Sequence, residues 1–304
     1  MSENSLWPDL PLSAWTDTCE TLHLWTQIAG KVRLKSTPLV NHWWNVTLQV
    51  NSRGLVAPAN INGGRSFDIA FDFVDHRLGI TTTDGRIESF ALAPMSVADF
   101  YAEFMHRLHR LDIDLHIWTM PSEIENAVPF DRDRAHAQYD PDYALRFRQA
   151  LVQAARVMNE FRARFIGKAS PVHFFWGSFD LAVSRFSGRR APPPPSNPVI
   201  PDPVNREAYS HEVSSCGFWP GNGGFGQPAF YSYAYPQPAG FADAPISPVG
   251  AYYAQGLGEF ILPYDVVREA EHPGECLLEF LESSYAAAAD LGNWDRPALE
   301  RRRA

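Results

Sequence analysis

Short runs in which apolar and polar residues alternate constrain the fold of this chain more than any other feature. One run covers His42–Val50 and another covers Phe67–Phe73. In both runs, apart from His42, every second residue is apolar, and the residues between them are mostly polar. Asn62-Gly63 and Asp84-Gly85 stand between the runs, and such pairs are typical of tight hairpin turns. The pattern predicts an antiparallel meander of strands over residues 41–91.

Helical periodicity alternates with further strand segments along the rest of the chain. The clearest helix is expected over 141–166, because Asp140 is a good N-cap, Pro141 suits the first helical position and Gly167 stops the helix. Other helices are expected over 13–29, 96–111 and 275–291. Further strands are expected over 116–118, 171–186, 209–219, 229–235 and 257–262. The fold class that follows is α+β, with antiparallel meanders and packed helices.

The order of elements suggests one compact unit over residues 1–304 with an internal repeat. His42–Val50 aligns without gaps to His173–Leu181, and both stretches are rich in aromatic residues. In both halves an aromatic strand leads to further strands, a Phe-x-Leu strand and a helix. Two interpretations stay open: a duplicated meander-plus-helix unit over 40–112 and 170–292, joined by the 141–166 helix, or a chance likeness between aromatic strands.

Charge and composition exclude several classes of partner. The formal net charge is −9 and the basic residues form no patch, so nucleic acid is not expected as a partner. No apolar run is long enough to cross a bilayer, and the N-terminal residues do not resemble a signal peptide. The three cysteines are odd in number and far apart. These features predict a cytoplasmic protein without a membrane partner.

The residues with chemical potential concentrate in 171–219 and in the strand that follows. Trp176, Ser178 and Asp180 fall on one face of a strand, where an apolar wall with a few polar groups suits a small ligand. His211 titrates near neutral pH and is the candidate general acid or base. Its neighbour Glu212 points to the opposite face of a regular strand, so the two form a dyad only across a bulge.

Two more residues complete the predicted site of a small-molecule enzyme. Arg185 is the candidate anion clamp, and Tyr231 belongs to a strand whose alternate tyrosines share one face. The catalytic candidates are therefore His211, Glu212 and Asp180. The candidates for binding substrate are Trp176, Ser178, Arg185 and Tyr231.

Two other functions remain open at this point. The tyrosine strand and the proline-rich stretch at 192–203, as a lid or a spacer, would suit a ligand-binding or protein-interaction surface without catalysis. His42, His173 and His211 would instead suit a metal centre, if three strands brought their imidazoles together. The sequence identifies no cofactor, substrate or oligomeric state.

Several long segments resemble one known family. They are Val40-Asn-His-Trp-Trp44, Phe71-Asp-Phe-Val-Asp-His-Arg-Leu78, His173-Phe-Phe-Trp-Gly-Ser-Phe-Asp180, Ser210-His-Glu-Val-Ser-Ser215 and Phe218-Trp-Pro-Gly221. The family is an uncharacterised bacterial domain of unknown function, and the resemblance runs from about Trp15 to Leu281. It implies a bacterial, cytoplasmic protein and brings no activity with it.

Overall fold

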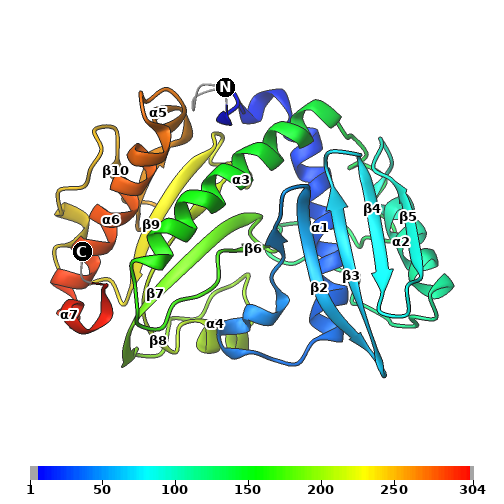
Figure 1. The fold of residues 1–304 in the computed structure, drawn as a ribbon, viewed down its shortest axis with the longest axis horizontal. Helices are drawn as coiled ribbons and strands as arrows, with labels where there is room; N and C mark the ends of the chain where they lie inside the picture. The colour runs from blue at the N-terminus through cyan, green and yellow to red at the C-terminus, as the bar shows by residue number, and fades with distance from the viewer. Residues whose placement is uncertain (1–5, 302–304) are drawn as a thin grey trace.

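The computed structural model describes residues 6–301, in which two antiparallel sheets lie side by side (Figure 1). The first sheet has five strands in chain order: β1 (Gln49–Val50), β2 (Gly54–Asn62), β3 (Arg65–Asp72), β4 (Arg77–Thr82) and β5 (Ile87–Ala91). The second has the order β10-β11-β9-β8-β7-β6, from β6 (His173–Phe175), β7 (Asp180–Arg190), β8 (His211–Trp219), β9 (Ala229–Tyr235), β10 (Tyr252–Ala254) and β11 (Glu259–Pro263). The predicted α+β class and the antiparallel meanders are confirmed.

Helices begin and end close to where the sequence signals place them. The described α-helices are α1 (Thr16–Ser36), α2 (Val97–Arg110), α3 (Pro141–Ala163), α4 (Asp202–Ala208), α5 (Tyr264–Arg268), α6 (Pro273–Leu291) and α7 (Arg296–Leu299), with 3₁₀ turns η2 (Leu12–Ala14), η3 (Asn41–Val46) and η4 (Phe241–Asp243). Ser96 caps α2 and Asp140 caps α3, each by accepting backbone N–H groups of the first turn. No described helix has both the length and the apolar character needed to cross a membrane.

The predicted strand over His42–Val50 is wrong for most of its length. Residues 41–46 form η3, in which His42 and Trp43 have left-handed backbones with φ of 57° and 61°. Leu48 exchanges two backbone hydrogen bonds with Phe174, of 2.9 and 2.8 Å, so the segment is held at the edge of the second sheet. Tertiary contacts therefore outweigh the local alternation. The expected strand at 116–118 is also absent, because that segment is irregular.

This difference bears on the proposed repeat. The segment that aligns with β6 is a helical turn, so the two most similar stretches of sequence do not share a conformation. Each half nevertheless contains a meander followed by a helix. Duplication of a meander-plus-helix unit stays a prediction.

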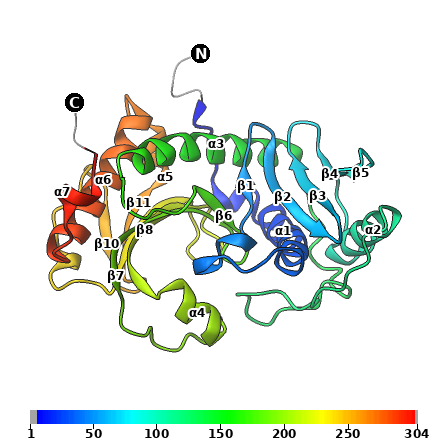
Figure 2. The same ribbon diagram turned by 60° about the horizontal axis from the view of Figure 1, so that its bottom comes forward.

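The two faces of the six-stranded sheet have different surroundings (Figure 2). Helices α3 and α6 cover one face, whose alternate residues form the main apolar core together with those helices. Buried members of that face include Leu181, Val183, Phe218, Phe230 and Leu262. Helix α4 and the proline-rich loop before it lie on the other face, where the alternate residues are mostly polar or aromatic.

Helix α1 connects the two halves of the chain. Its Trp25 stacks on Phe100 of α2 with ring centroids 4.6 Å apart. On another side, the Trp176 indole lies directly on Gly30, where any side chain would collide with the ring. The indole nitrogen of Trp176 donates a 2.8 Å hydrogen bond to the carbonyl of Val46. Trp176 therefore packs between the halves as part of the core.

Candidate active site

Strand register collects polar residues on the face of the sheet below α4. Ser184 pairs with Ser215, Ser215 pairs with Tyr233, and Glu259 comes beside Tyr233 because Phe260 pairs with Ser232. The Ser184 hydroxyl donates a 2.9 Å hydrogen bond to the hydroxyl of Ser215. Because strand residues two apart share a face, Asp180 and Tyr231 belong to the same surface. One polar row thus crosses β7, β8, β9 and β11.

Asp180 is the buried centre of this surface. Its side chain is only 7% exposed, and its carboxylate accepts hydrogen bonds from the hydroxyls of Ser178 and Tyr231. Burial raises the pKa of Asp180, while the two hydroxyl donors oppose the shift. The structure therefore brings together three residues that the sequence indicated: Asp180, Ser178 and Tyr231.

Two glutamates lie close enough to Asp180 to sense its charge. Burial, together with the charge of Asp180, raises the pKa of Glu259 to about 7. The same two causes raise the pKa of Glu123 to about 7, although this residue is exposed to solvent. Glu123 comes from an irregular loop, has a left-handed φ of 59°, and rests its carboxylate on Gly177, where a side chain would displace it.

A network from α1 holds the loop of Glu123 in place. The side-chain amide of Gln27 accepts from the backbone N–H of Ser122 at 2.7 Å and donates to the carbonyl of Ser122 at 2.9 Å. His23, one turn earlier, contacts the carbonyl of Gly177 at 2.8 Å. Helix α1 thereby fixes both sides of the contact between Glu123 and Gly177.

Tyrosines form the wall between this carboxyl cluster and the proline-rich loop. The hydroxyls of Tyr209 and Tyr233 lie 3.1 Å apart, and the ring of Tyr209 packs edge-on against Tyr235 at 5.1 Å. A cavity of about 390 Å³ opens between this wall and the loop, and Glu259 lines it. We call this cavity, with its lining and the adjoining Asp180, Tyr231 and Glu123, the tyrosine pocket. The volume suits a small metabolite.

Among residues 6–301, the three carboxyl groups of the tyrosine pocket lack a direct cationic partner. Within residues 6–301, no lysine, arginine or histidine nitrogen lies within 4.0 Å of a carboxylate oxygen of Glu123, Asp180 or Glu259. Since the charge of the buried Asp180 adds to the raised pKa values of both glutamates, these two groups keep their protons up to about pH 7. The pocket is therefore chemically suited to exchange protons with a ligand.

The other predicted site residues lie elsewhere. Arg185 is on the opposite face of β7, 1% exposed, with its guanidinium 3.3 Å from the centroid of the Phe161 ring and 3.6 Å from Glu282. Glu212 points away from the pocket and forms a 2.7 Å ion pair with Arg189. His211 is four residues from Ser215 along β8, roughly 13 Å away. Arg185 and Glu212 thus cannot act on a ligand in the tyrosine pocket.

The proposed histidine metal site is only partly assembled. The rings of His42 and His211 approach to 5.8 Å between centroids. His173 lies beyond Trp44, 1% exposed, and its Nδ1 contacts the hydroxyl of Thr47 at 3.1 Å. In the part of the chain that the structure describes, no three His, Cys, Asp or Glu side chains are arranged to hold a metal ion.

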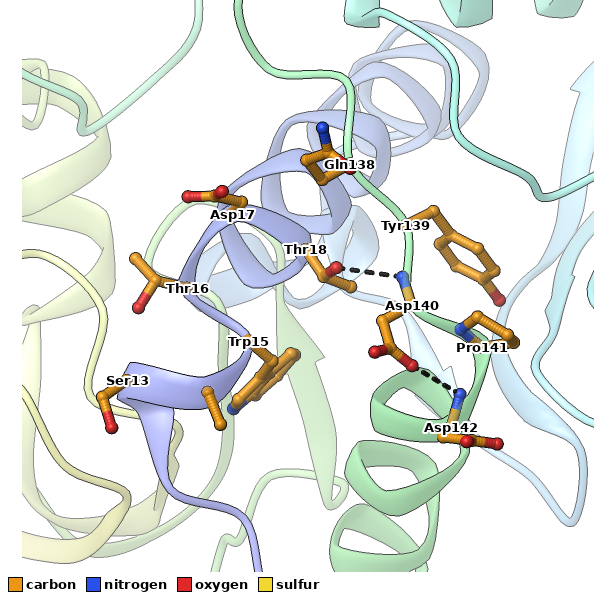
Figure 3. Close-up of a pocket in the computed structure, with 11 residues that line it drawn as sticks. Ser13, Trp15, Thr16, Asp17, Thr18, Gln138, Tyr139, Asp140, Pro141 and Asp142 are labelled. Carbon is orange, nitrogen blue, oxygen red and sulfur yellow. Dashed lines mark hydrogen bonds between the residues drawn. The ribbon is translucent and has the colours of Figure 1, made fainter.

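A second hollow of about 580 Å³ lies where α1 and α3 begin (Figure 3). Thr18 accepts a 3.0 Å hydrogen bond from the backbone N–H of Asp140, and Asp140 accepts one of 2.9 Å from that of Asp142. The carboxylates of Asp17 and Asp142 point in opposite directions in Figure 3. This hollow is lined by helix caps and lacks a converging acid–base pair, so the tyrosine pocket is the better candidate.

Sequence reasoning missed Glu123 and Glu259 as site residues. Glu259 had a weak signal, because it is the charged residue of the strand predicted over 257–262, which the structure pairs with the tyrosine strand. Glu123 had none, because its loop has no periodicity and its position depends on contacts with α1. These two residues turn the partly predicted site into a carboxyl cluster.

Comparison with known proteins gives a family and no activity. No curated protein and no solved structure matches the chain. One family model, described as a family of unknown function (DUF5996), matches residues 7–301. The match spans both sheets and includes every residue of the tyrosine pocket, in agreement with the resemblance noted in the sequence. The chain belongs to the DUF5996 family.

Proposed function

We propose that this protein is a small-molecule enzyme in which carboxyl groups carry out general acid–base chemistry in the tyrosine pocket. The observation that carries the proposal is Glu259, whose pKa is raised to about 7 and whose side chain lines a cavity beside Asp180. A group with a pKa near the working pH is the most effective proton carrier, because both of its forms are populated. Perturbed carboxyl groups in a cavity are typical of active sites.

The role of each residue follows from its position relative to the cavity. Glu259 faces the cavity and is the group that donates a proton to the substrate or removes one from it. Asp180 stays behind it, held by the Ser178 and Tyr231 hydroxyls, and its charge adds to the burial that raises the pKa of Glu259. The rings of Tyr209, Tyr233 and Tyr235 offer faces and hydroxyls to a polar ring or a planar group. The reaction class is proton transfer or hydrolysis of a polar metabolite.

This mechanism replaces the histidine chemistry suggested by the sequence. His211 lies near the other end of β8, and Arg185 is buried on the opposite face. Carboxyl groups with raised pKa values serve the same purpose as a histidine, because both titrate near neutral pH. The proposal therefore keeps the general acid–base chemistry predicted from the sequence and assigns it to carboxyl groups in place of His211.

A non-catalytic ligand-binding role is the second candidate. It is favoured by the absence of a cation beside the three carboxyl groups within residues 6–301, since a bound amine would supply the missing charge. Such a protein would hold its ligand unchanged. Turnover therefore separates the two candidates.

The test is the Glu259→Gln variant in an untargeted assay. Wild-type protein is incubated with a metabolite extract, and consumed and produced compounds are followed by mass spectrometry. We expect conversion of at least one polar metabolite, and a loss of about 10²- to 10⁴-fold in its rate for Glu259→Gln. Glu271→Gln, which neutralises an exposed glutamate elsewhere, is the matched control and should retain the wild-type rate.

Either of two outcomes would overturn the catalytic proposal. Retention of the wild-type rate by Glu259→Gln would remove this residue from the chemistry. Enrichment of a metabolite by the wild-type protein without any conversion would favour the ligand-binding role instead.

A cytoplasmic location in a bacterium fits this proposal. Cys19, Cys216 and Cys276 are all free thiols, as expected in a reducing compartment. The family resemblance noted in the sequence points to a bacterial source.

A further inference from the structure

A second polar cluster lies where β7 meets η3 and α4, at the end of the sheet remote from Asp180. Lys168, His42 and His211 gather there over the aromatic rings of Trp44 and Phe186. The Lys168 ammonium lies 5.0 Å from the centroid of Phe186 and 5.5 Å from that of Trp44. Figure 1 shows α4 beside the blue turn that contains η3. None of these residues belongs to the tyrosine pocket.

Hydrogen bonding fixes the protonation state of His42. Its Nδ1 lies 2.9 Å from the carbonyl of Ala208, which can only accept, so Nδ1 carries the proton. Its Nε2 lies 2.6 Å from the Lys168 ammonium, which can only donate, so Nε2 offers a lone pair. His42 is therefore neutral, and it orients a charged lysine without cancelling its charge.

The local charges do not balance. Burial and the Lys168 charge both lower the pKa values of His42 and His211, and Arg190 adds to the effect at His211. Glu207 is the carboxylate that opposes them, and it accepts the backbone N–H of His42 at 3.3 Å. Within residues 6–301, the Lys168 ammonium has no carboxylate oxygen within 4.0 Å. The Lys168 ammonium is therefore not neutralised by a direct ion pair within this part of the chain, and its charge is available to an anion.

The backbone at this cluster is also unusual. His42 and Trp43 are consecutive left-handed residues without glycine, a conformation that side chains other than glycine seldom adopt. The strained turn places the His42 ring on Phe186, with centroids 4.6 Å apart, and on Ala208. Trp44 and His211 are half-buried and Lys168 is exposed, so solvent and a dissolved anion reach the lysine from the open side. The turn thereby brings the His42 Nε2 atom to the Lys168 ammonium.

We propose that Lys168, oriented by neutral His42, forms with His211 a binding site for a small oxyanion, the phosphate or carboxylate group of a metabolite. Lys168 has donors left after its bond to His42, and they make charge-assisted hydrogen bonds to the anion. His211 anchors its Nδ1 on the hydroxyl of Ser210 at 3.0 Å, which leaves Nε2 for the ligand. The site is independent of the function proposed for the tyrosine pocket.

The test uses three probes on the full chain: sulfate, inorganic phosphate and acetate, each titrated against chloride at constant ionic strength. Binding is read by NMR from the proton and carbon shifts of the His42 ring, which contacts Lys168, lies beside His211 and is present in every variant. We expect sulfate, which stays a dianion across the range, to bind more tightly as the pH falls and His211 becomes charged. Phosphate bound more tightly than acetate identifies a phosphorylated ligand, and the reverse order identifies a carboxylate.

Variants distinguish binding at this site from nonspecific electrostatic attraction of anions to the protein surface. Lys168→Met should weaken sulfate binding by about 10- to 100-fold, the worth of a charge-assisted hydrogen bond. Lys35→Met removes an exposed lysine from α1 and should leave binding unchanged. If Lys168→Met does not fold, His211→Gln serves instead, and it should abolish the pH dependence of sulfate binding.

Three results would overturn the proposal. One is a wild-type protein that binds none of the probes. Another is equal binding by Lys168→Met and wild type, and the third is a pH dependence that survives in folded His211→Gln.

Discussion

Replacing Arg185 with alanine should cost about 3–5 kcal/mol of the free energy of unfolding and leave the tyrosine pocket intact. The guanidinium is almost fully buried between β7 and the helices α3 and α6. It donates a hydrogen bond to the carbonyl of Phe161, lies 4.3 Å from the centroid of the Tyr285 ring, and is 3.6 Å from Glu282. Truncation removes all of these contacts and leaves a buried carbonyl and part of a carboxylate without a partner.

The measurement is chemical denaturation, with Arg132→Ala as the control. Arg132 has a mostly exposed side chain, and its loss should change stability by no more than about 0.5 kcal/mol. Arg185→Met, which fills the space without the charge, should be less damaging than alanine. If Arg185→Ala were as stable as Arg132→Ala and lost ligand binding in the pocket, the assignment of Arg185 to the core would be wrong.

Glu259→Gln should make the protein more stable at pH 8, by about 2–3 kcal/mol, while changing little at pH 4. In the folded chain the carboxyl keeps its proton up to about pH 7, whereas in the unfolded chain it ionises above about pH 4.5. The stability that this group contributes is therefore complete below pH 4.5 and is lost as the pH rises through 7. Glutamine has no such ionisation, so the variant avoids the loss.

Denaturation of both proteins across this pH range measures the effect. The difference between variant and wild type should grow from pH 4.5 to pH 7 and then level off. His23 and His173 instead make the folded protein more stable as the pH rises, because burial lowers their pKa values to about 4 and about 3. Both proteins contain these histidines, so their contribution cancels in the difference. A variant that is less stable than wild type at pH 8 would contradict a raised pKa for Glu259.

Much of the fold follows from local sequence signals. The cap at Asp140, the proline at 141 and the apolar stripe between them and Gly167 locate α3 to within a few residues, because these signals act within one element. Strand β9 has the predicted bounds, because the alternation of its side chains is also a signal within one element. The turn at His42–Trp43 could not be found this way, since it depends on Phe174 and Ala208, both more than a hundred residues away.

The candidate site was predictable only in part, because the strand expected over 171–186 is broken by a turn at 176–179, where alternation does not apply. Asp180 of β7 and Tyr231 of β9 share a face of the sheet, and the tyrosine reaches the carboxylate across Gly217 of β8, the strand between them. Arg185 is five residues from Asp180 on the same strand, so alternation alone places it on the opposite face of the sheet. The prediction that Arg185 belongs to the site rested on its closeness to Asp180 in the sequence and was wrong. Glu123 is beyond local reasoning, because a left-handed residue in an irregular loop takes its place from tertiary contacts.

The central claim is that carboxyl groups of the tyrosine pocket hold protons near neutral pH, and a carbon NMR titration of the glutamate side chains tests it most directly. Assigning the Glu259 resonance by comparison with Glu259→Gln, we expect its carboxyl carbon to titrate with a midpoint at about pH 7, together with that of Glu123. A midpoint near 4.5 for Glu259, the ordinary value of a solvated glutamate, would contradict the account.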